Sequence, residues 1–438
     1  MSIYVRSAPS ISTELSLWGA PTTNTAIVDN RSIEVYPLAS IESSDTVSFV
    51  IPPLPNQMLD HVEIVVDLRV LTANGTNPAP NQNVGTQPML SASLFRNVDV
   101  TIGNTSLLQS YDYSACCFKF WETVLNHRQG SSAYLKHKEG LILDHVSKLD
   151  SEDTIYHPVA VADEDVPAVV NHQGKHRANR IKEGRIVHII TDLDFPVFKG
   201  NKLLPPNLAI NVALTKSPDE FILLSAANDT SKIVYDKIAL RCHFKTPAEP
   251  LLHIIEERLS KENAVFRCDK KTMSTIPLTQ GARSVTLENV FRGTLPYYFL
   301  IGVQGRPAFG RNREKNAFTL HKIQKCSVYL NNIPIFSSAV HLTEHDLTQG
   351  YCNLISNTGS INQGDTLLHN AYGAYPALAV DLTRDSSMNQ LGMNLSRHGS
   401  VRILLEFDQE LPANRCLMVL GWYERLIEIT KDRDVIVV

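Results

Sequence analysis

The chain has 438 residues, of which 43% are hydrophobic and 20% are charged. That hydrophobic share is typical of folded proteins and excludes a mainly disordered chain. The 41 Lys and Arg residues nearly balance the 45 Asp and Glu residues, which gives a formal net charge of −4. This balance excludes a protein whose main role is to neutralise nucleic-acid phosphates, although it leaves room for a local basic patch.

The sequence also lacks the signals of a membrane or secreted protein. No apolar run reaches the roughly 18 residues that cross a bilayer. The first ten residues lack the charged-then-apolar pattern of a secretory signal. We therefore expect a soluble chain without a membrane span, made outside the secretory route. The seven cysteines are scattered and contain no Cys-x-x-Cys pair, which predicts reduced, mostly buried thiols in place of disulfides or a zinc ribbon.

Short β-strands separated by turns account for most of the chain. Residues 62–71 are apolar and rich in β-branched side chains, and residues 98–102 alternate between apolar and polar side chains. Gly103-Asn104 follows directly and suits a tight hairpin, because glycine and asparagine tolerate positive φ angles. We predict further strands at residues 186–191, 207–214, 232–244, 297–303, 326–330, 401–407 and 416–421. This pattern favours antiparallel sheets packed as sandwiches or barrels over a βαβ fold.

Two segments have the apolar spacing of helices. Residues 114–127 place four apolar side chains on one helical face, and residues 250–262 begin with a proline at the first helical position. The second segment lies just past the midpoint, where a linker between two domains would be. The polar stretches 72–92 and 130–184 are predicted to be loops.

Three pairs of segments resemble each other in the same order along the chain, each with a turn beside a strand. The matched pairs are 97–107 with 325–335, 49–53 with 274–278, and 204–214 with 411–421. Such an ordered set predicts two copies of one β-domain. We therefore expect an N-terminal arm (1–30), a first β-domain (31–245), a linker helix (246–263) and a second β-domain (264–438).

No complete catalytic motif is found. Residues 305–310 have the glycine spacing of a phosphate-binding loop, but Arg311 and Asn312 stand where Lys and Ser/Thr would hold phosphate and Mg²⁺. No Gly-x-Ser-x-Gly motif of a nucleophilic serine is present. We therefore predict that the protein is not an enzyme and has no cofactor.

Histidine and aspartate pairs give weaker signals. His172 and His176 are four residues apart, but the glycine between them argues against a helix. Residues 341–345 match the His-x-x-Glu-His string of one metalloprotease class, without a continuing helical pattern. Asp192 and Asp194 could form a carboxylate pair on one strand face. For each of these pairs we favour ordinary solvated side chains over a metal or catalytic site.

The most basic segment covers residues 174–186. Its five basic side chains are candidate contacts for nucleic-acid phosphates or for a partner protein, and they are Lys175, Arg177, Arg180, Lys182 and Arg185. No Phe, Tyr or Trp lies among them to stack on a base, so reading of single strands is not indicated. A solvated loop or a protein contact is the favoured interpretation.

Several strings, in the same order, resemble the double-jelly-roll major capsid proteins of Polinton (Maverick) elements and the related adintoviruses. They are residues 93–104, 120–127, 289–296, 308–310 with 315–318, and 422–437. Two departures are Ala317, where the family usually has proline, and His127, where it usually has tyrosine; these affect the subgroup more than the fold.

The resemblance implies an all-β fold of two jelly-roll sandwiches in tandem, with a few short helices. It further implies three chains forming a pseudo-hexagonal capsomer that tiles an icosahedral shell. Expected partners are other copies of the chain, minor and penton capsid proteins, and encapsidated double-stranded DNA at the inner surface. The expected location is the virion capsid, assembled in the host cytoplasm or nucleus. The alternatives are an accessory or domesticated β-sandwich protein that binds, for example, surface carbohydrates, and a hydrolase on the same scaffold.

Overall fold

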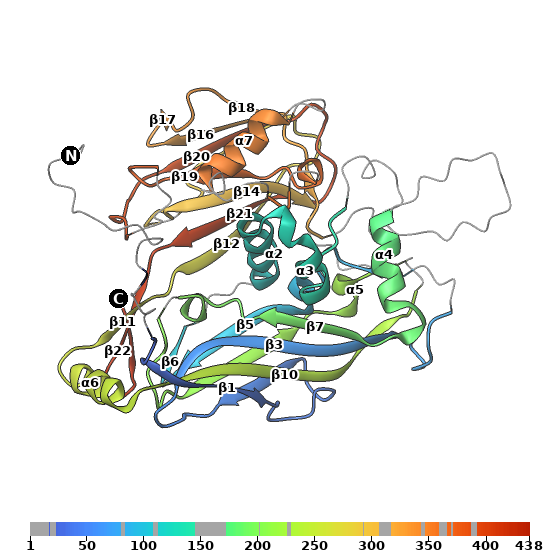
Figure 1. Ribbon diagram of the computed structural model, residues 1–438. Coiled ribbons are helices and arrows are strands. Elements are labelled where there is room, and N and C mark those ends of the chain that lie inside the picture. Colours follow the sequence, from blue (N-terminus) through green and yellow to red (C-terminus); the bar gives the residue numbers. More distant parts are fainter. Residues whose placement is uncertain are drawn as a thin grey trace.

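The first half of the chain folds into two facing antiparallel sheets (Figure 1). The computed structural model describes residues 17, 23–79, 84–107, 113–144, 172–200, 202–225, 229–291, 293–305, 317–342, 347–358, 366–368, 371–386 and 392–438. One sheet has the strand order β1-β10-β3-β7 and the other β2-β8-β5-β6, with a small β4-β9 pair beside them. The strands are β1 Ile27–Val35, β2 Thr46–Ile51, β3 Met58–Leu71, β4 Val84–Thr86, β5 Phe95–Ile102, β6 Thr105–Ser106, β7 Val187–Asp192, β8 Ile210–Lys216, β9 Leu223–Ser225 and β10 Lys232–Pro247.

The second half repeats this arrangement. One sheet runs β12-β21-β14-β15, with β19 also paired to β14, and the other runs β13-β20-β16-β17, with β18 also paired to β16. The strands are β12 Lys270–Pro277, β13 Ser284–Leu287, β14 Tyr298–Gly305, β15 Leu320–His321, β16 Lys325–Leu330, β17 Ile333–Pro334, β18 Val340–His341, β19 Leu378–Asp381, β20 Val401–Glu406 and β21 Arg415–Tyr423.

The two halves order their strands in the same way. In one sheet, the order β1-β10-β3-β7 of the first half corresponds to β12-β21-β14-β19 of the second. In the other sheet, β2-β8-β5-β6 corresponds to β13-β20-β16-β17. Each half is therefore a jelly roll of two antiparallel sheets, and the predicted all-β tandem fold is confirmed. All nine predicted strands are present within a few residues of their expected bounds.

Only one of the three matched sequence pairs joins equivalent strands. The β5-β6 hairpin does correspond to the β16-β17 hairpin, and both turn through residues with positive φ, Gly103 in the first and Asn331 and Asn332 in the second. The other two matches were wrong by one strand, because they align β2 with β12 and β8 with β21. Neighbouring strands share the same alternation of apolar residues, so short strings do not distinguish them.

A third, smaller sheet joins the two halves. It consists of β11 Ala264–Arg267, β22 Leu426–Ile429 and β23 Val435–Val437, in the order β11-β22-β23. Its last strand lies against the β5-β6 hairpin of the first jelly roll, where the Thr105 hydroxyl donates to the Val435 carbonyl at 2.8 Å. The hairpin turn is so close that a Cβ on Gly103 would lie 2.9 Å from the Arg433 carbonyl oxygen.

Short helices lie in the connections between the strands of the two sandwiches. They are α1 Leu90–Leu94, α2 Ser114–Asn126, α3 Ser132–Lys138, α4 His172–Ile181, α5 Asp219–Ile222, α6 Glu249–Leu259 and α7 Thr348–Asn357, with 3-10 turns at Gln129–Ser131, Lys182–Gly184, Pro196–Phe198 and Tyr372–Ala374. Helices α2 and α6 confirm the two predicted helices. The loop prediction was wrong for part of 130–184, which contains α3 and α4, and for part of 72–92, which contains β4 and the start of α1. Residues 145–171 lie outside the described part of the chain.

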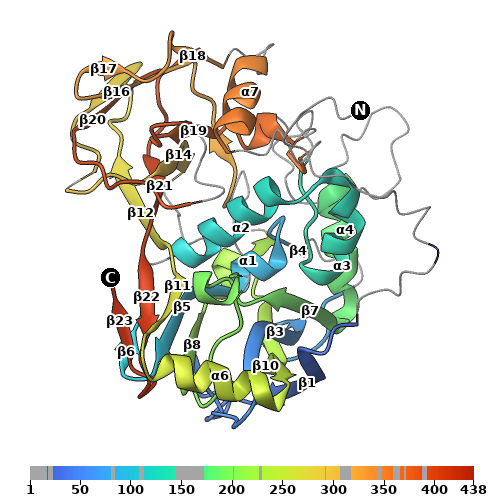
Figure 2. The ribbon, with the colours of Figure 1, turned by 60° about the vertical axis from the view of Figure 1, so that its left-hand side comes forward.

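Helix α2 lies between the two jelly rolls (Figures 1 and 2). Phe118 meets Trp422 of β21 edge-on with ring centroids 5.0 Å apart, and Phe120 stacks on Phe318 of the second half at 4.4 Å. Both of these rings contact the second half, while α2 also packs against α1 and β5 of the first half. Burial of these aromatic rings joins the two sandwiches into one hydrophobic core.

Candidate functional site

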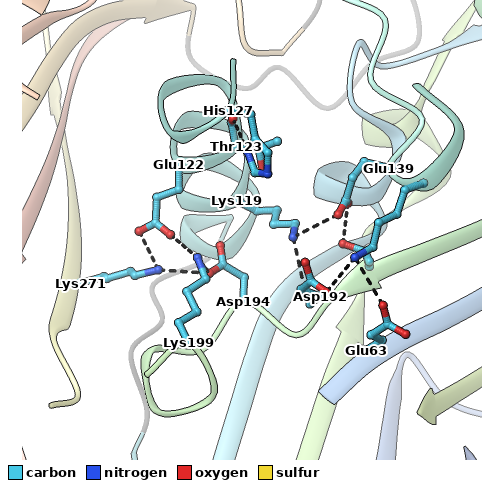
Figure 3. Close-up of polar contacts among 12 residues, drawn as sticks. Glu63, Lys119, Glu122, Thr123, His127, Glu139, Asp192, Asp194, Lys199 and Lys271 are labelled. Carbon is cyan, nitrogen blue, oxygen red and sulfur yellow. Dashed lines mark hydrogen bonds and ion pairs between the residues drawn. The ribbon is translucent and has the colours of Figure 1, made fainter. Parts of the chain in front are cut away.

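A cluster of largely buried charged residues lies where the two jelly rolls meet (Figure 3). Glu122 projects from α2 and accepts a hydrogen bond from the indole Nε1 of Trp422 at 2.9 Å. Its carboxylate also pairs with the ammonium of Lys271 on β12 at 2.7 Å, and with that of Lys199 at 2.7 Å. Trp422 and Lys271 belong to the second jelly roll, so Glu122 connects the two halves directly.

Asp194 completes this cluster from the segment after β7. Its carboxylate pairs with Lys199 and lies 3.4 Å from the ammonium of Lys271. Burial alone would raise the pKa of Asp194, but the nearby lysine charges outweigh burial and hold its pKa below the ordinary carboxyl value. Asp194 therefore stays ionised and is unsuited to act as a general acid near neutral pH.

A second ion cluster adjoins the first on the first jelly roll (Figure 3). Lys138 of α3 pairs with Asp192 at 2.9 Å and with Glu63 of β3 at 3.3 Å. Lys119 of α2 lies 3.6 Å from Glu139, which also accepts the Thr191 hydroxyl at 2.6 Å. Burial raises the pKa of Asp192, but hydrogen bonding to Lys138 more than offsets that and leaves it lowered.

The two clusters change the interpretation of Asp192 and Asp194. The prediction that both are simply solvated was wrong for Asp194, which is enclosed among lysines. Each carboxylate has its own lysine partners, so the two do not share a proton as a catalytic pair would. The arrangement stabilises the junction and offers no reactive group.

The remaining chemical candidates give no site either. Among the described residues, no group of three His, Cys, Asp or Glu side chains could hold a metal ion. His172 lies at the start of α4, so the prediction that residues 172–176 are not helical was wrong. Residues 343–346 and 306–316, which include most of the His-x-x-Glu-His string and of the glycine loop, lie outside the described residues. All seven cysteines are free and six are buried, so the predicted burial of most thiols is confirmed.

The basic segment folds as α4 and a 3-10 turn, and it points two of its five basic side chains inward. Arg177 is only 1% exposed; its guanidinium pairs with Asp144 at 2.8 Å and donates to the Ile142 carbonyl at 2.8 Å. Arg180 donates to the Lys136 carbonyl at 2.8 Å and also reaches the His137 and His188 carbonyls. Burial lowers the pKa of Arg180.

Arg177 and Arg180 thus correct the predicted contact set. They satisfy carbonyls and a buried carboxylate, so they hold α4 against the first jelly roll and are not placed to meet phosphate. Lys175 and Arg185 are exposed and Lys182 is partly exposed. The side-chain nitrogens of Lys182 and Arg185 each lie 3.7 Å from a carboxylate oxygen of Glu183.

Comparison with solved structures identifies the architecture. A chain of the Sputnik virophage, determined by cryo-EM at 3.5 Å resolution, matches with a TM-score of 0.63 at 10% identity, covering 100% of this chain and 94% of that chain. A chain of the PBCV-1 virus capsid gives a TM-score of 0.58 at 11% identity (96% and 98% covered). The mavirus major capsid protein gives 0.52 at 11% identity (100% and 96% covered). The chain has the double-jelly-roll fold.

These structural neighbours are double-jelly-roll major capsid proteins of large DNA viruses and virophages. No protein-family model matches the sequence, and no curated protein matches it. At about 10% identity the likeness of this double jelly roll to its neighbours is one of fold, so no residue role is transferred from them. No helix in the described ranges is long and apolar enough to span a membrane.

Proposed function

We propose that this double-jelly-roll chain is a major capsid protein. The observation that carries the proposal is the extent of the structural match, which covers 96–100% of this chain and 94–98% of the three neighbours described above. Hardly any of the chain lies outside the match to form a separate enzymatic or binding domain. The ion clusters at the junction, with each carboxylate held by lysines, favour a structural role over catalysis.

Three copies of the chain would form the building block. Each chain contributes two sandwiches of the same topology, so a closed ring of three chains presents six similar sandwiches with only three-fold symmetry. Such a pseudo-hexagonal block packs against six neighbours and tiles an icosahedral shell.

The finer points of the proposal come from the sequence resemblance. We place the chain with the Polinton and adintovirus capsid proteins, located in the virion after assembly in the host cell. Its partners would be further copies of itself, minor and penton capsid proteins, and double-stranded DNA inside the shell. The division into an arm (1–30), two jelly rolls (31–245 and 264–438) and a linker helix (246–263) remains part of this proposal, with the arm shortened because β1 already begins at Ile27.

Mass photometry of the purified chain tests the proposal. We expect a species of three times the 48.8 kDa chain mass, with a hexagonal outline in negative-stain electron microscopy, and closed shells when protein concentration and salt are raised. A chain that stays monomeric at high concentration, and that forms no particle at any salt or pH tried, would contradict the proposal.

A further inference from the structure

The two equivalent hairpins have different surroundings. The β5-β6 turn of the first jelly roll is covered by the C-terminal segment, through Thr105 and Val435 and the close approach of Gly103 to Arg433. The β16-β17 turn of the second jelly roll is uncovered, with residues 331–334 all exposed and Ile333 69% exposed. An isoleucine at an uncovered hairpin tip suggests a contact that a single chain does not make.

The helices that follow these hairpins show the same difference. Helix α2 lies between the two jelly rolls, with Phe118 and Glu122 turned to the second one. Its counterpart α7 lies on the far side of the second jelly roll, at the top of Figure 1, and buries only Gly350 and Leu354. The first jelly roll contacts the second through the β5-β6 hairpin and α2. The equivalent face of the second jelly roll, formed by the β16-β17 hairpin and α7, is not covered by the rest of the described chain.

The surface of the second jelly roll that contacts α2 also has an equivalent in the first jelly roll. In the second jelly roll this face is built from the edge strand β12, its neighbour β21, and the segments β11 and β22 that extend them. The equivalents in the first jelly roll are the edge strand β1, its neighbour β10, and the extension α6. These lie at the bottom of Figure 1, at the opposite end of the molecule from α7 and β17, and Figure 2 agrees.

This second face carries exposed apolar side chains. The sequence of helix α6 places several apolar side chains on one side, but among its residues only Leu259 is buried. Leu251 is 39% exposed and Ile254 is 55% exposed. The first turn of α6 lies beside the start of β1, because the Ala248 amide donates to the Ala26 carbonyl at 2.9 Å, and Val28 of β1 is exposed as well.

We propose that the β16-β17 hairpin and α7 of one chain dock on β1 and α6 of the next chain. This inference rests on the proposed capsid function and names its subunit interface. The partner is a second copy because the same pair of faces already meets once within each chain, at the junction built by α2, β12 and β21. If the same head-to-tail contact occurs within each chain and between chains, three chains of two sandwiches close into a ring. In this arrangement Ile333 of one chain lies against the exposed apolar side chains of α6 in the next.

The substitution Ile333→Asp tests the docking. It places a charge in the proposed apolar contact, so we expect the trimer dissociation constant to rise at least about tenfold, measured by mass photometry across a dilution series. Ile186→Asp is the matched control, because Ile186 is also exposed (53%) and lies off both faces. At a concentration where all three proteins are monomeric, both variants should melt at the temperature of the unchanged chain, since neither side chain is buried within a single chain.

Cross-linking gives an independent measurement. Cys352 on α7 is the exposed one of the seven cysteines, so Ile254→Cys on α6 adds a second reactive thiol on the facing surface. A bismaleimide should then link chains into dimers and trimers on a denaturing gel. Adding Cys352→Ser should abolish the ladder, and Ile186→Cys in place of Ile254→Cys should not produce it.

The outcomes separate this inference from the proposed function. If the unchanged chain is monomeric, the capsid proposal itself fails. If it is trimeric, but Ile333→Asp leaves the trimer intact and no cross-linked ladder forms, the trimer uses other faces and only the docking inference is overturned.

Discussion

Asp194 shows how a single residue couples the junction to pH. Its pKa is lowered in the folded protein by the surrounding lysines, in spite of burial. A carboxylate with a lowered folded pKa stabilises the fold above its unfolded pKa of about 3.9, and this contribution is lost as the pH falls below that value.

We therefore predict that the free energy of unfolding falls as the pH is lowered below about 4, and that Asp194→Asn makes this fall shallower. At neutral pH the variant should be less stable by about 1–3 kcal/mol, because Lys199 and Lys271 lose a charged partner. Denaturant titrations between pH 3 and pH 7 measure both effects. Asp432→Asn, at an exposed aspartate, is the control; equal pH slopes for Asp194→Asn and the unchanged chain would contradict the prediction.

At the scale of elements, α2 determines how the two jelly rolls are held together. Glu122→Gln keeps the shape of the side chain but removes the charge that faces Lys271 and Lys199. We expect a loss of about 2–4 kcal/mol in the free energy of unfolding, with faster hydrogen exchange in β12 and β21 near the junction.

Hydrogen exchange followed by mass spectrometry locates the effect of Glu122→Gln. The matched control is Glu257→Gln on α6, whose pair with Lys261 is more than half exposed, so its loss should change stability by less than about 0.5 kcal/mol. Faster exchange confined to the strands of the first jelly roll, with β12 and β21 unchanged, would mean that Glu122 stabilises the first jelly roll alone and not the junction.

Elements with a regular side-chain period could be predicted from the sequence. Residues 98–102 alternate and end in Gly103-Asn104, so both the strand and its hairpin were correctly placed. Helix α4 was missed because Gly174 and a run of polar residues hide its period. The inward turn of Arg177 depends on Asp144, which is distant in the sequence, and no local pattern reports such a pair.

The junction was not predictable for the same reason. Glu122, Asp194 and Lys271 come from three separate elements, and each looks like an ordinary charged residue in its own segment. Glu122 could have been noticed only as a carboxylate on a largely apolar helix, where an enclosed charge requires a charged partner.

For the whole molecule, the near-neutral charge fits the proposed function, in which protein contacts hold a shell together and any DNA contact is confined to local patches. If the basic segment 174–186 faces the interior of the proposed shell, its exposed or partly exposed basic side chains are Lys175, Lys182 and Arg185. We predict that changing these three to Ala lowers the amount of packaged DNA per particle while trimers remain intact, because only counterion-type contacts are removed.

The measurement is the ratio of absorbance at 260 nm to that at 280 nm in purified particles. Arg177 and Arg180 are left unchanged, since their buried contacts support α4. The control changes three other exposed basic residues to Ala, namely Arg283, Arg384 and Lys431. Equal DNA content in both triple variants would show that α4 makes no specific contribution to packaging.

The C-terminal strand that covers the first hairpin has a consequence for synthesis. Thr105 and its acceptor Val435 are 330 residues apart, so the first jelly roll stays unfinished until residues up to Val435 have left the ribosome. A chain truncated before β23 would carry two bare hairpins and could receive a neighbour at the wrong one. A chain that contains β23 leaves the β16-β17 hairpin as the uncovered one, so formation of β23 would be a condition for closing the proposed ring correctly.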